Sequence, residues 1–196
     1  MNKKWITIGI IVIVVFIIYR MFAGTYNNMV TMDEEVNTQW SNVETQYQRR
    51  YDLIPNLVNT VKGFAEQERE VLVGVTEARS KASGIQVDAS NMTQEQLSQF
   101  NAAQSQLNSA LSRLLVTVEK YPELKSNQNF LELQAQLEGT ENRITVARQR
   151  FNGAAQDYNT YIRKFPNTML AGMFGFERKP LFEADANASS APKVEF

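Results

Sequence analysis

The chain has 196 residues, with 20 basic and 21 acidic side chains and neither cysteine nor histidine. The absence of these two residue types excludes Ser-His-Asp and Cys-His nucleophile pairs, Cys/His zinc sites, disulfides and Glu-x-x-His di-iron bundles. Catalysis by carboxylates or lysines alone stays open, but we predict no enzymatic activity, no cofactor and no metal site.

The first predicted element is a transmembrane helix at residues 5–23, which follows a short N-terminal segment at 1–4. Arg20 is its only charged residue, and its apolar run covers roughly 27 Å, close to the hydrocarbon thickness of a bilayer. Trp5 and Tyr19 are placed as interfacial aromatics, and the long Arg20 stem can carry its charge to the headgroups. A cleaved signal peptide is the alternative. The apolar run is not followed by alternating small residues, which favours a retained anchor.

The distribution of basic residues predicts the orientation of this anchor. Lys3 and Lys4 precede the span, and beyond Arg20 the next basic residue is Arg49. The positive-inside rule therefore places the N-terminus in the cytoplasm and residues 24–196 on the other side. Without Lys3, Lys4 and Arg20 the remaining 17 basic residues face 21 acidic ones. A formal charge of −4 on this part as a whole argues against nucleic acid as a partner and against binding to anionic lipid through charge.

Residues 24–166 are predicted to form an all-α, elongated, antiparallel bundle with four helices and coiled-coil packing. Apolar residues repeat at spacings of three and four throughout, the period of a helix rather than of a strand. Such alternation over five heptads is typical of a supercoiled seam, and the most regular stripe contains Phe130, Leu133, Leu137, Thr140, Ile144, Ala147, Phe151, Ala154, Tyr158, Tyr161 and Phe165. Three polar residues fall at seam positions and predict a buried polar layer that fixes the register: Glu68, Gln104 and Thr140.

Pro55 leaves two arrangements open for the first half of the bundle. Inside a helix, proline deletes a hydrogen bond and costs about 3 kcal/mol, whereas in a first turn it costs little. Asp52 is a candidate N-cap that would place Pro55 in a first turn. A reversal at this point gives four helices of similar length, so we favour it over a single rod from residue 26 to residue 80. Ser83-Gly84 predicts the end of the next helix, and Asn91-Met92-Thr93 with Glu95 and Gln96 offers N-cap candidates for the one that follows.

In a four-helix arrangement the last helix returns to the membrane, so the apolar segment at 167–182 is expected near the bilayer. One interpretation is a flap that closes the end of the bundle core. The other is contact with the membrane surface, with Arg178 and Lys179 facing headgroups. The residues expected at that surface are Met169, Leu170, Met173, Phe174 and Phe176. Residues 183–196 lack periodicity and are predicted to be a disordered tail.

Arg49, Arg50, Asp52 and Pro55 form a candidate partner-docking site. Paired guanidinium groups bind carboxylates in a bidentate manner. The alternative is structural, because cations stabilise a helix C-terminus and Asp52 would cap the next helix.

Several helices also carry adjacent apolar residues, which cover a wider sector than one packing face needs. A central position in the bundle would explain them. Contacts between copies of the chain are the alternative, and the candidate self-association residues are Val71, Val73, Leu115, Val116 and Leu131.

Three sequence motifs in the chain resemble motifs of the LemA family. They are Val36-Asn37-x-x-Trp40-Ser41-x-Val43-Glu44-x-Gln46-x-x-Arg49-Arg50-x-Asp52-Leu53-Ile54-Pro55-Asn56-Leu57-Val58, Tyr121-Pro122-x-Leu124-Lys125-x-Asn127 and Thr140-Glu141-Asn142-Arg143-Ile144. The resemblance covers roughly residues 24–182. It implies a bacterial protein with one N-terminal membrane helix and a helical-bundle domain, and it supplies no enzymatic activity.

Together these observations predict a membrane-anchored scaffold or adaptor that self-associates in the bacterial inner (plasma) membrane. Other envelope proteins are further candidate partners. The alternative function is a peptide- or protein-binding accessory module for an envelope transporter or protease. A pocket between helices would favour that alternative, whereas a filled core would favour the scaffold.

Overall fold

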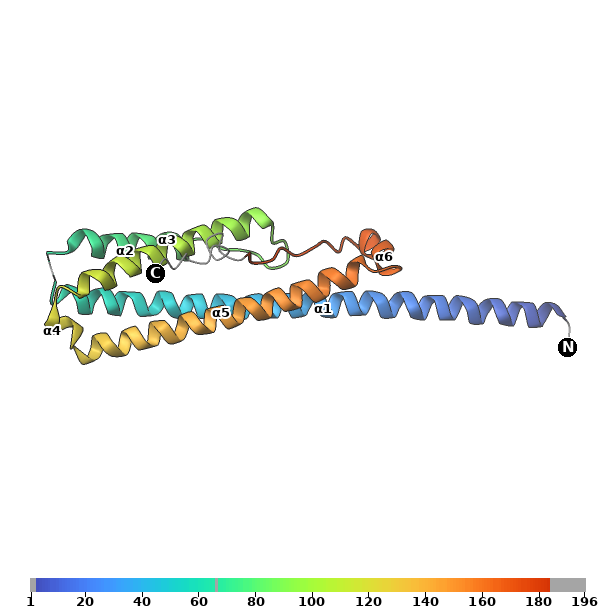
Figure 1. The fold of residues 1–196 in the computed structure, drawn as a ribbon. Coiled ribbons are helices and arrows are strands. Elements are labelled where there is room, and N and C mark those ends of the chain that lie inside the picture. The colour runs from blue at the N-terminus through green and yellow to red at the C-terminus, as the bar shows by residue number, and fades with distance from the viewer. Residues whose placement is uncertain (1–2, 66, 184–196) are drawn as a thin grey trace, which may run out of the picture.

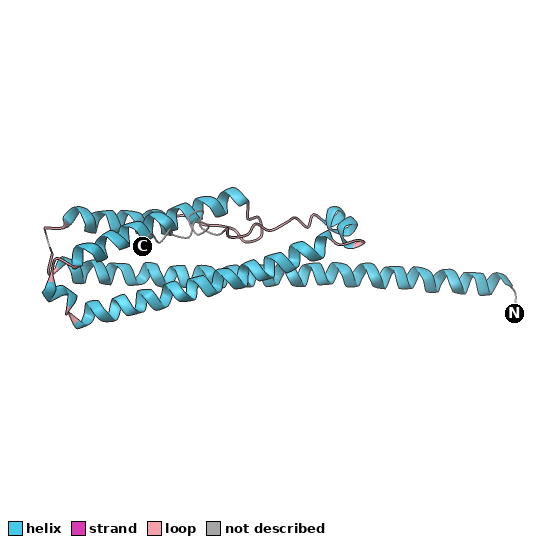
Figure 2. Cartoon of the chain, in the orientation of Figure 1, coloured by secondary structure: helices cyan, strands magenta, loops and turns pink. Residues whose placement is uncertain are grey.

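The structure is a computed structural model that describes residues 3–65 and 67–183. The predicted tail from residue 184 onward and residues 1–2 of the N-terminal segment lie outside the described residues. Within those residues there are six helices and no strand (Figure 2), which confirms the all-α prediction. The helices are α1 (Lys3–Lys62), α2 (Arg69–Ser83), α3 (Gln94–Val118), α4 (Pro122–Lys125), α5 (Gln128–Arg163) and α6 (Asn167–Phe174).

Four of these helices form an elongated antiparallel bundle, as predicted (Figure 1). The chain leaves the N-terminal end along α1, returns along α2, runs out again along α3 and returns along α5. α1 packs along α5 and α2, and α2 packs along α3, whereas α3 and α5 make few direct contacts. The side between α3 and α5 is therefore the open side of the bundle.

The membrane-spanning stretch is not a separate helix but the first part of α1. α1 has 60 residues, which corresponds to a length of about 90 Å. Among the described residues, it is the one helix whose length and composition suffice to cross a membrane. Its residues 4–22 are exposed, whereas side chains from Met29 to Val61 along one face are buried. In Figure 1 this N-terminal part of α1 projects alone beyond the bundle.

The predicted reversal at Pro55 is wrong, because α1 continues through this residue to Lys62. The carbonyl of Tyr51, which a proline at position 55 leaves without its helical donor, accepts a hydrogen bond from Arg79 Nε of α2 at 2.7 Å. Asp52 caps no helix and instead accepts a hydrogen bond from Gln48 at 2.8 Å within α1. The chain reverses after Lys62, in the loop before α2.

The core is centred on Trp40 of α1. Its ring lies 5.6 Å from the ring of Phe100 on α3, 5.5 Å from Phe151 on α5 and 5.9 Å from Phe182, which follows α6. Its indole N–H donates to the carbonyl of Val87 in the loop between α2 and α3, at 3.2 Å. Buried aromatic rings in these edge-to-face and stacked arrangements add stability beyond their buried area. One residue of α1 thus joins elements from most of the chain.

The helix boundaries follow local signals in the sequence. Thr93 forms a capping box with Gln96 at the start of α3 and is thus the N-cap among the predicted candidates, and α2 ends at Ser83 as predicted. The seam predicted along α5 is buried at six positions, which are Phe130, Thr140, Ile144, Ala147, Phe151 and Tyr158. Its members Leu133, Leu137, Ala154 and Tyr161 are half-buried. The prediction is wrong at Phe165, which lies beyond the end of α5 and is 82% exposed.

Candidate functional site

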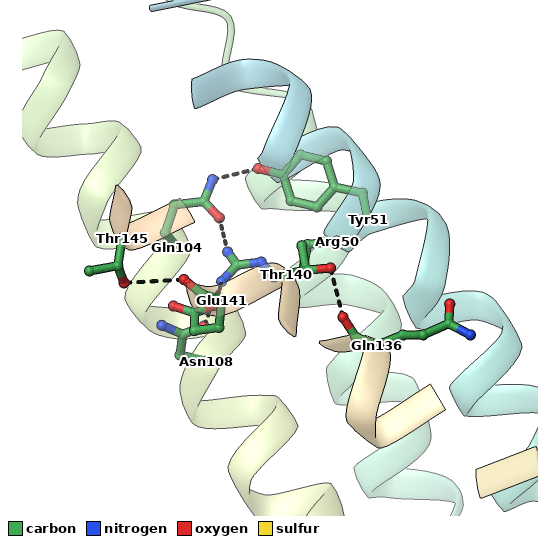
Figure 3. Close-up of polar contacts among 8 residues, drawn as sticks. All are labelled: Arg50, Tyr51, Gln104, Asn108, Gln136, Thr140, Glu141 and Thr145. Atoms are coloured by element: carbon green, nitrogen blue, oxygen red, sulfur yellow. Dashed lines mark hydrogen bonds and ion pairs between the residues drawn. The ribbon is translucent and has the colours of Figure 1, made fainter. Parts of the chain in front are cut away.

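A buried polar cluster around Arg50 lies in the middle of the bundle, between α1, α3 and α5 (Figure 3). The Arg50 side chain is 2% exposed, and its Nη1 donates to Asn108 at 2.8 Å and to Glu141 at 3.0 Å. Its Nη2 donates to Gln104, whose own amide N–H donates to the Tyr51 hydroxyl at 2.5 Å. Buried charges are stable only with such partners, so the cluster fixes how three helices align.

The chemistry of this cluster favours a structural role. Burial raises the pKa of Tyr51, against the opposing effects of the Gln104 hydrogen bond and the Arg50 charge. The tyrosine therefore stays neutral and acts as a hydrogen-bond partner. Glu141 is half exposed, so water solvates the part of its carboxylate that Arg50 does not contact. The two terminal nitrogens of Arg50 are paired, whereas its buried Nε has no hydrogen-bond partner among the described residues. Hydrogen bonds between buried polar groups of different helices specify the register of a helical bundle.

The predicted polar layer is confirmed at Gln104 and Thr140, which are both buried, and is wrong at Glu68. Glu68 lies before α2 at the end of the bundle, where it accepts a hydrogen bond from the Tyr121 hydroxyl at 3.0 Å. Arg50 belongs to the buried cluster in its place.

The predicted docking residues separate into two groups. Arg50 faces the interior, so it does not present its guanidinium to a partner, and the expectation that it lies at the surface was wrong. Arg49, Asp52 and Pro55 are exposed. Arg49 and Asp52 line a shallow groove of about 800 Å³ between α1 and the end of α2, and Pro55 lies outside it.

A second groove opens on the side between α3 and α5. It has a volume of about 330 Å³. Its apolar lining comes from Leu57, Leu111, Leu115 and Leu137, and its polar lining from Arg50, Asn108, Ser112, Gln134, Glu138 and Glu141. The Arg50 cluster therefore borders a concave surface that is accessible from solvent.

Residues 175–183, which we call the C-terminal strap, run without helical structure along α5. The Asn159 side chain pairs with the backbone of Lys179, donating at 2.8 Å and accepting at 2.9 Å. Asn152 pairs with the backbone of Phe182 in the same way, with both distances at 2.9 Å. These two asparagines lie seven residues apart on one face of α5, a spacing that sequence reasoning did not interpret.

Lys179 joins the strap to the rest of the bundle and is 8% exposed. Its ammonium group lies 3.0 Å from Asp33 of α1 and donates to the carbonyls of Ala89 and Ser90, each at 3.1 Å. The interpretation in which Lys179 faces lipid headgroups is therefore wrong for this residue, whereas Arg178 is exposed.

The segment expected near the membrane has both a buried and an exposed side. Leu170 is buried against the bundle and Phe176 is half-buried. Met169, Met173 and Phe174 are 63%, 73% and 54% exposed. The flap interpretation therefore fits Leu170, and membrane contact of the exposed residues stays a prediction. In the anchor, Trp5, Tyr19 and Arg20 are exposed on the part of α1 that extends beyond the bundle.

The candidate self-association residues all lie at the end of the bundle far from the anchor. Val71 and Val73 belong to the first turns of α2, Leu115 and Val116 to the last turn of α3, and Leu131 to the first turn of α5. Val71 is half-buried, while the exposed fractions of the other four range from 37% at Leu115 to 68% at Val116. We call this end the distal tip.

Comparison with known proteins places the chain in a family. The model of the LemA family matches residues 39–196, from one residue before Trp40 of α1 onward. The chain belongs to the LemA family. This LemA-family chain is 29% identical over 177 residues to magnetosome protein MamQ 1 of Paramagnetospirillum magneticum, and 23% identical over 182 residues to protein LemA of Metamycoplasma hominis.

The extent of these matches differs. The alignment covers 81% of this LemA-family chain and 64% of the MamQ protein, so the chain spans less than two thirds of that relative's length. The match to the mycoplasmal LemA protein covers 93% of this chain and 80% of the relative. The family description and the names of these relatives specify no enzymatic activity.

Proposed function

We propose that this LemA-family chain is a non-enzymatic, membrane-anchored scaffold or adaptor. The observation that carries the proposal is the continuity of α1, which runs without a break from the apolar exposed stretch into the core of the bundle. A continuous helix transmits the orientation of its anchor to the domain it enters, whereas a flexible linker does not. Such a molecule suits the task of holding other proteins at a defined place relative to a membrane.

The proposed location is the inner (plasma) membrane of a bacterium, with the N-terminus in the cytoplasm and the bundle on the other side. The proposal is supported by Lys3 and Lys4 before the span, since basic residues stay on the cytoplasmic side. A cysteine introduced at exposed Gln149 tests this orientation. If the bundle lies outside the cytoplasm, this cysteine should react with a membrane-impermeant maleimide added to intact spheroplasts. The labelling reports on position 149 alone, because the chain has no other cysteine.

Self-association is proposed to use the distal tip, where the exposed apolar residues gather. The test is disulfide cross-linking of Val116→Cys in native membranes, with Gln149→Cys in the middle of α5 as the matched control. Cross-linked dimers are expected for Val116→Cys and not for Gln149→Cys. Mass measurement of lipid-bound particles gives an independent result, and a strict monomer would refute self-association.

A second candidate function, a peptide- or protein-binding accessory module for an envelope transporter or protease, is favoured by the groove between α3 and α5. The strap supplies a precedent, because its extended backbone already pairs with Asn152 and Asn159 on α5. A photo-cross-linking residue at Leu137 in the groove should then capture a peptide partner, and one at exposed Gln149 should not.

A further inference from the structure

The exposed side of α6 forms an apolar surface at the end of the bundle that adjoins the anchor. Met169, Met173 and Phe174 project from α6, and Phe165, from the loop before it, is 82% exposed. α6 itself contains no charged residue. Large exposed apolar side chains that cluster in this way mark a contact surface.

The position of α6 along α1 is fixed by aromatic contacts with Tyr26. The Tyr26 ring lies 4.9 Å from the ring of Phe174 and 5.7 Å from that of Phe176, both in edge-to-face geometry. Tyr26 follows the end of the apolar run at Phe22 by four residues, which corresponds to about 6 Å along the helix. α6 therefore lies at the height where the hydrocarbon region ends and the headgroups begin.

The neighbouring charges suit the same location. Arg163 and Lys164 at the end of α5, and Arg178 in the strap, are exposed, and Glu177 is an exposed acidic residue beside them. An apolar face with basic residues at its margin is the composition of helices that lie in the interface of membranes containing anionic lipid.

We propose that α6 is a second membrane attachment, which inserts Met169, Met173 and Phe174 into the headgroup region of the same bilayer that α1 spans. Leu170 and Ala171 on the opposite side of α6 are 5% exposed and hold it against the bundle. The bundle is then held at two points, and its tilt relative to the membrane is fixed. This inference rests on the anchoring of α1 in the proposed function, and it does not depend on self-association.

The experiment uses the full-length chain in vesicles of phosphatidylcholine and phosphatidylglycerol. Because the chain has no cysteine, single variants accept one environment-sensitive fluorophore each. Lipids with a nitroxide on either the upper or the lower part of the acyl chain quench it on contact. The three positions are Met173→Cys on α6, Val116→Cys at the distal tip as the equally exposed apolar control, and Ile13→Cys within the anchor.

We expect the nitroxide lipids to quench Met173→Cys and Ile13→Cys severalfold and to leave Val116→Cys unchanged. Quenching at Ile13→Cys alone would overturn the proposal for α6 while leaving the anchor intact. The proposal is also overturned if Met173→Cys is shielded from aqueous iodide but not quenched by the lipid label, since a protein then covers α6. Absence of quenching at all three positions would overturn both the anchor and this inference.

Discussion

Pro55 and Arg79 are expected to be energetically coupled through the carbonyl of Tyr51. A proline at position 55 cannot donate to this carbonyl, and Arg79 Nε of α2 does so instead at 2.7 Å. Tyr51 is 5% exposed, so water is a poor substitute for the lost donor. Arg79→Ala should therefore lower the free energy of unfolding by about 1–3 kcal/mol, the cost of a buried unpaired carbonyl.

The double-mutant cycle with Pro55→Ala tests this reasoning. Alanine at position 55 restores the helical N–H donor, so Pro55→Ala should stabilise the chain by roughly 1–2 kcal/mol, part of the usual cost of an interior proline. In that background Arg79→Ala should cost about 1 kcal/mol or less, because the carbonyl keeps one donor. Lys81→Ala, an exposed basic position on the same helix, is the matched control.

Guanidinium unfolding of the full-length chain in detergent gives these energies. A Trp5→Phe background leaves Trp40, the other of the two tryptophans, as the reporter in the core. The coupling would be refuted if Arg79→Ala lowered the free energy of unfolding by the same amount with proline and with alanine at position 55.

Four further predictions follow from the described contacts. Arg50→Met should cost about 1–3 kcal/mol, because buried Gln104 loses its donor while Asn108 and Glu141 stay accessible to water, whereas exposed Arg49→Ala should cost less than about 0.5 kcal/mol in the same unfolding assay. Asn159→Ala removes two hydrogen bonds to Lys179 and should speed amide exchange in the strap; unchanged exchange would contradict the role of Asn159. Burial raises the pKa of Tyr158 from 10.0 to about 12. The unfolded state therefore loses this proton first as pH rises, and the unfolding free energy should fall between about pH 10 and pH 12 by at most ~2.7 kcal/mol, less in Tyr158→Phe. Gly24→Ala, with nothing within 4 Å of the added carbon, should stabilise α1 by about 0.5–1 kcal/mol and slow amide exchange beside position 24.

The features that the sequence predicted well depend on interactions between residues close together in the chain. The helical period defined the all-α class and much of the seam of α5, and the N-cap of α3 is one of the candidates at 91–93. Each of these signals spans only a few residues, so it requires no knowledge of the partners that packing brings together. The return of the last helix toward the anchor followed from the number of helices alone.

The features that the sequence did not predict depend on distant partners. Arg79 lies 28 residues from the carbonyl that it satisfies, and nothing near Pro55 reveals that donor. The mistaken break at Pro55 then led to a second error. A helix that ended there would place Arg50 at its C-terminus, where a cation is stabilising, whereas in continuous α1 it faces the core between Tyr47 and Ile54.

The distribution of tertiary contacts divides the bundle into two halves with different properties. Toward the anchor, Lys179 binds Asp33 and the loop between α2 and α3, while Asn159 and Asn152 hold the strap to α5. The strap thereby closes this half. Toward the distal tip, the groove between α3 and α5 is open and exposed apolar residues remain. A half that is closed and held by hydrogen bonds and an ion pair changes shape less easily than an open one. We therefore expect the half near the anchor to set the orientation of the bundle relative to the membrane, and the distal half to bind partners.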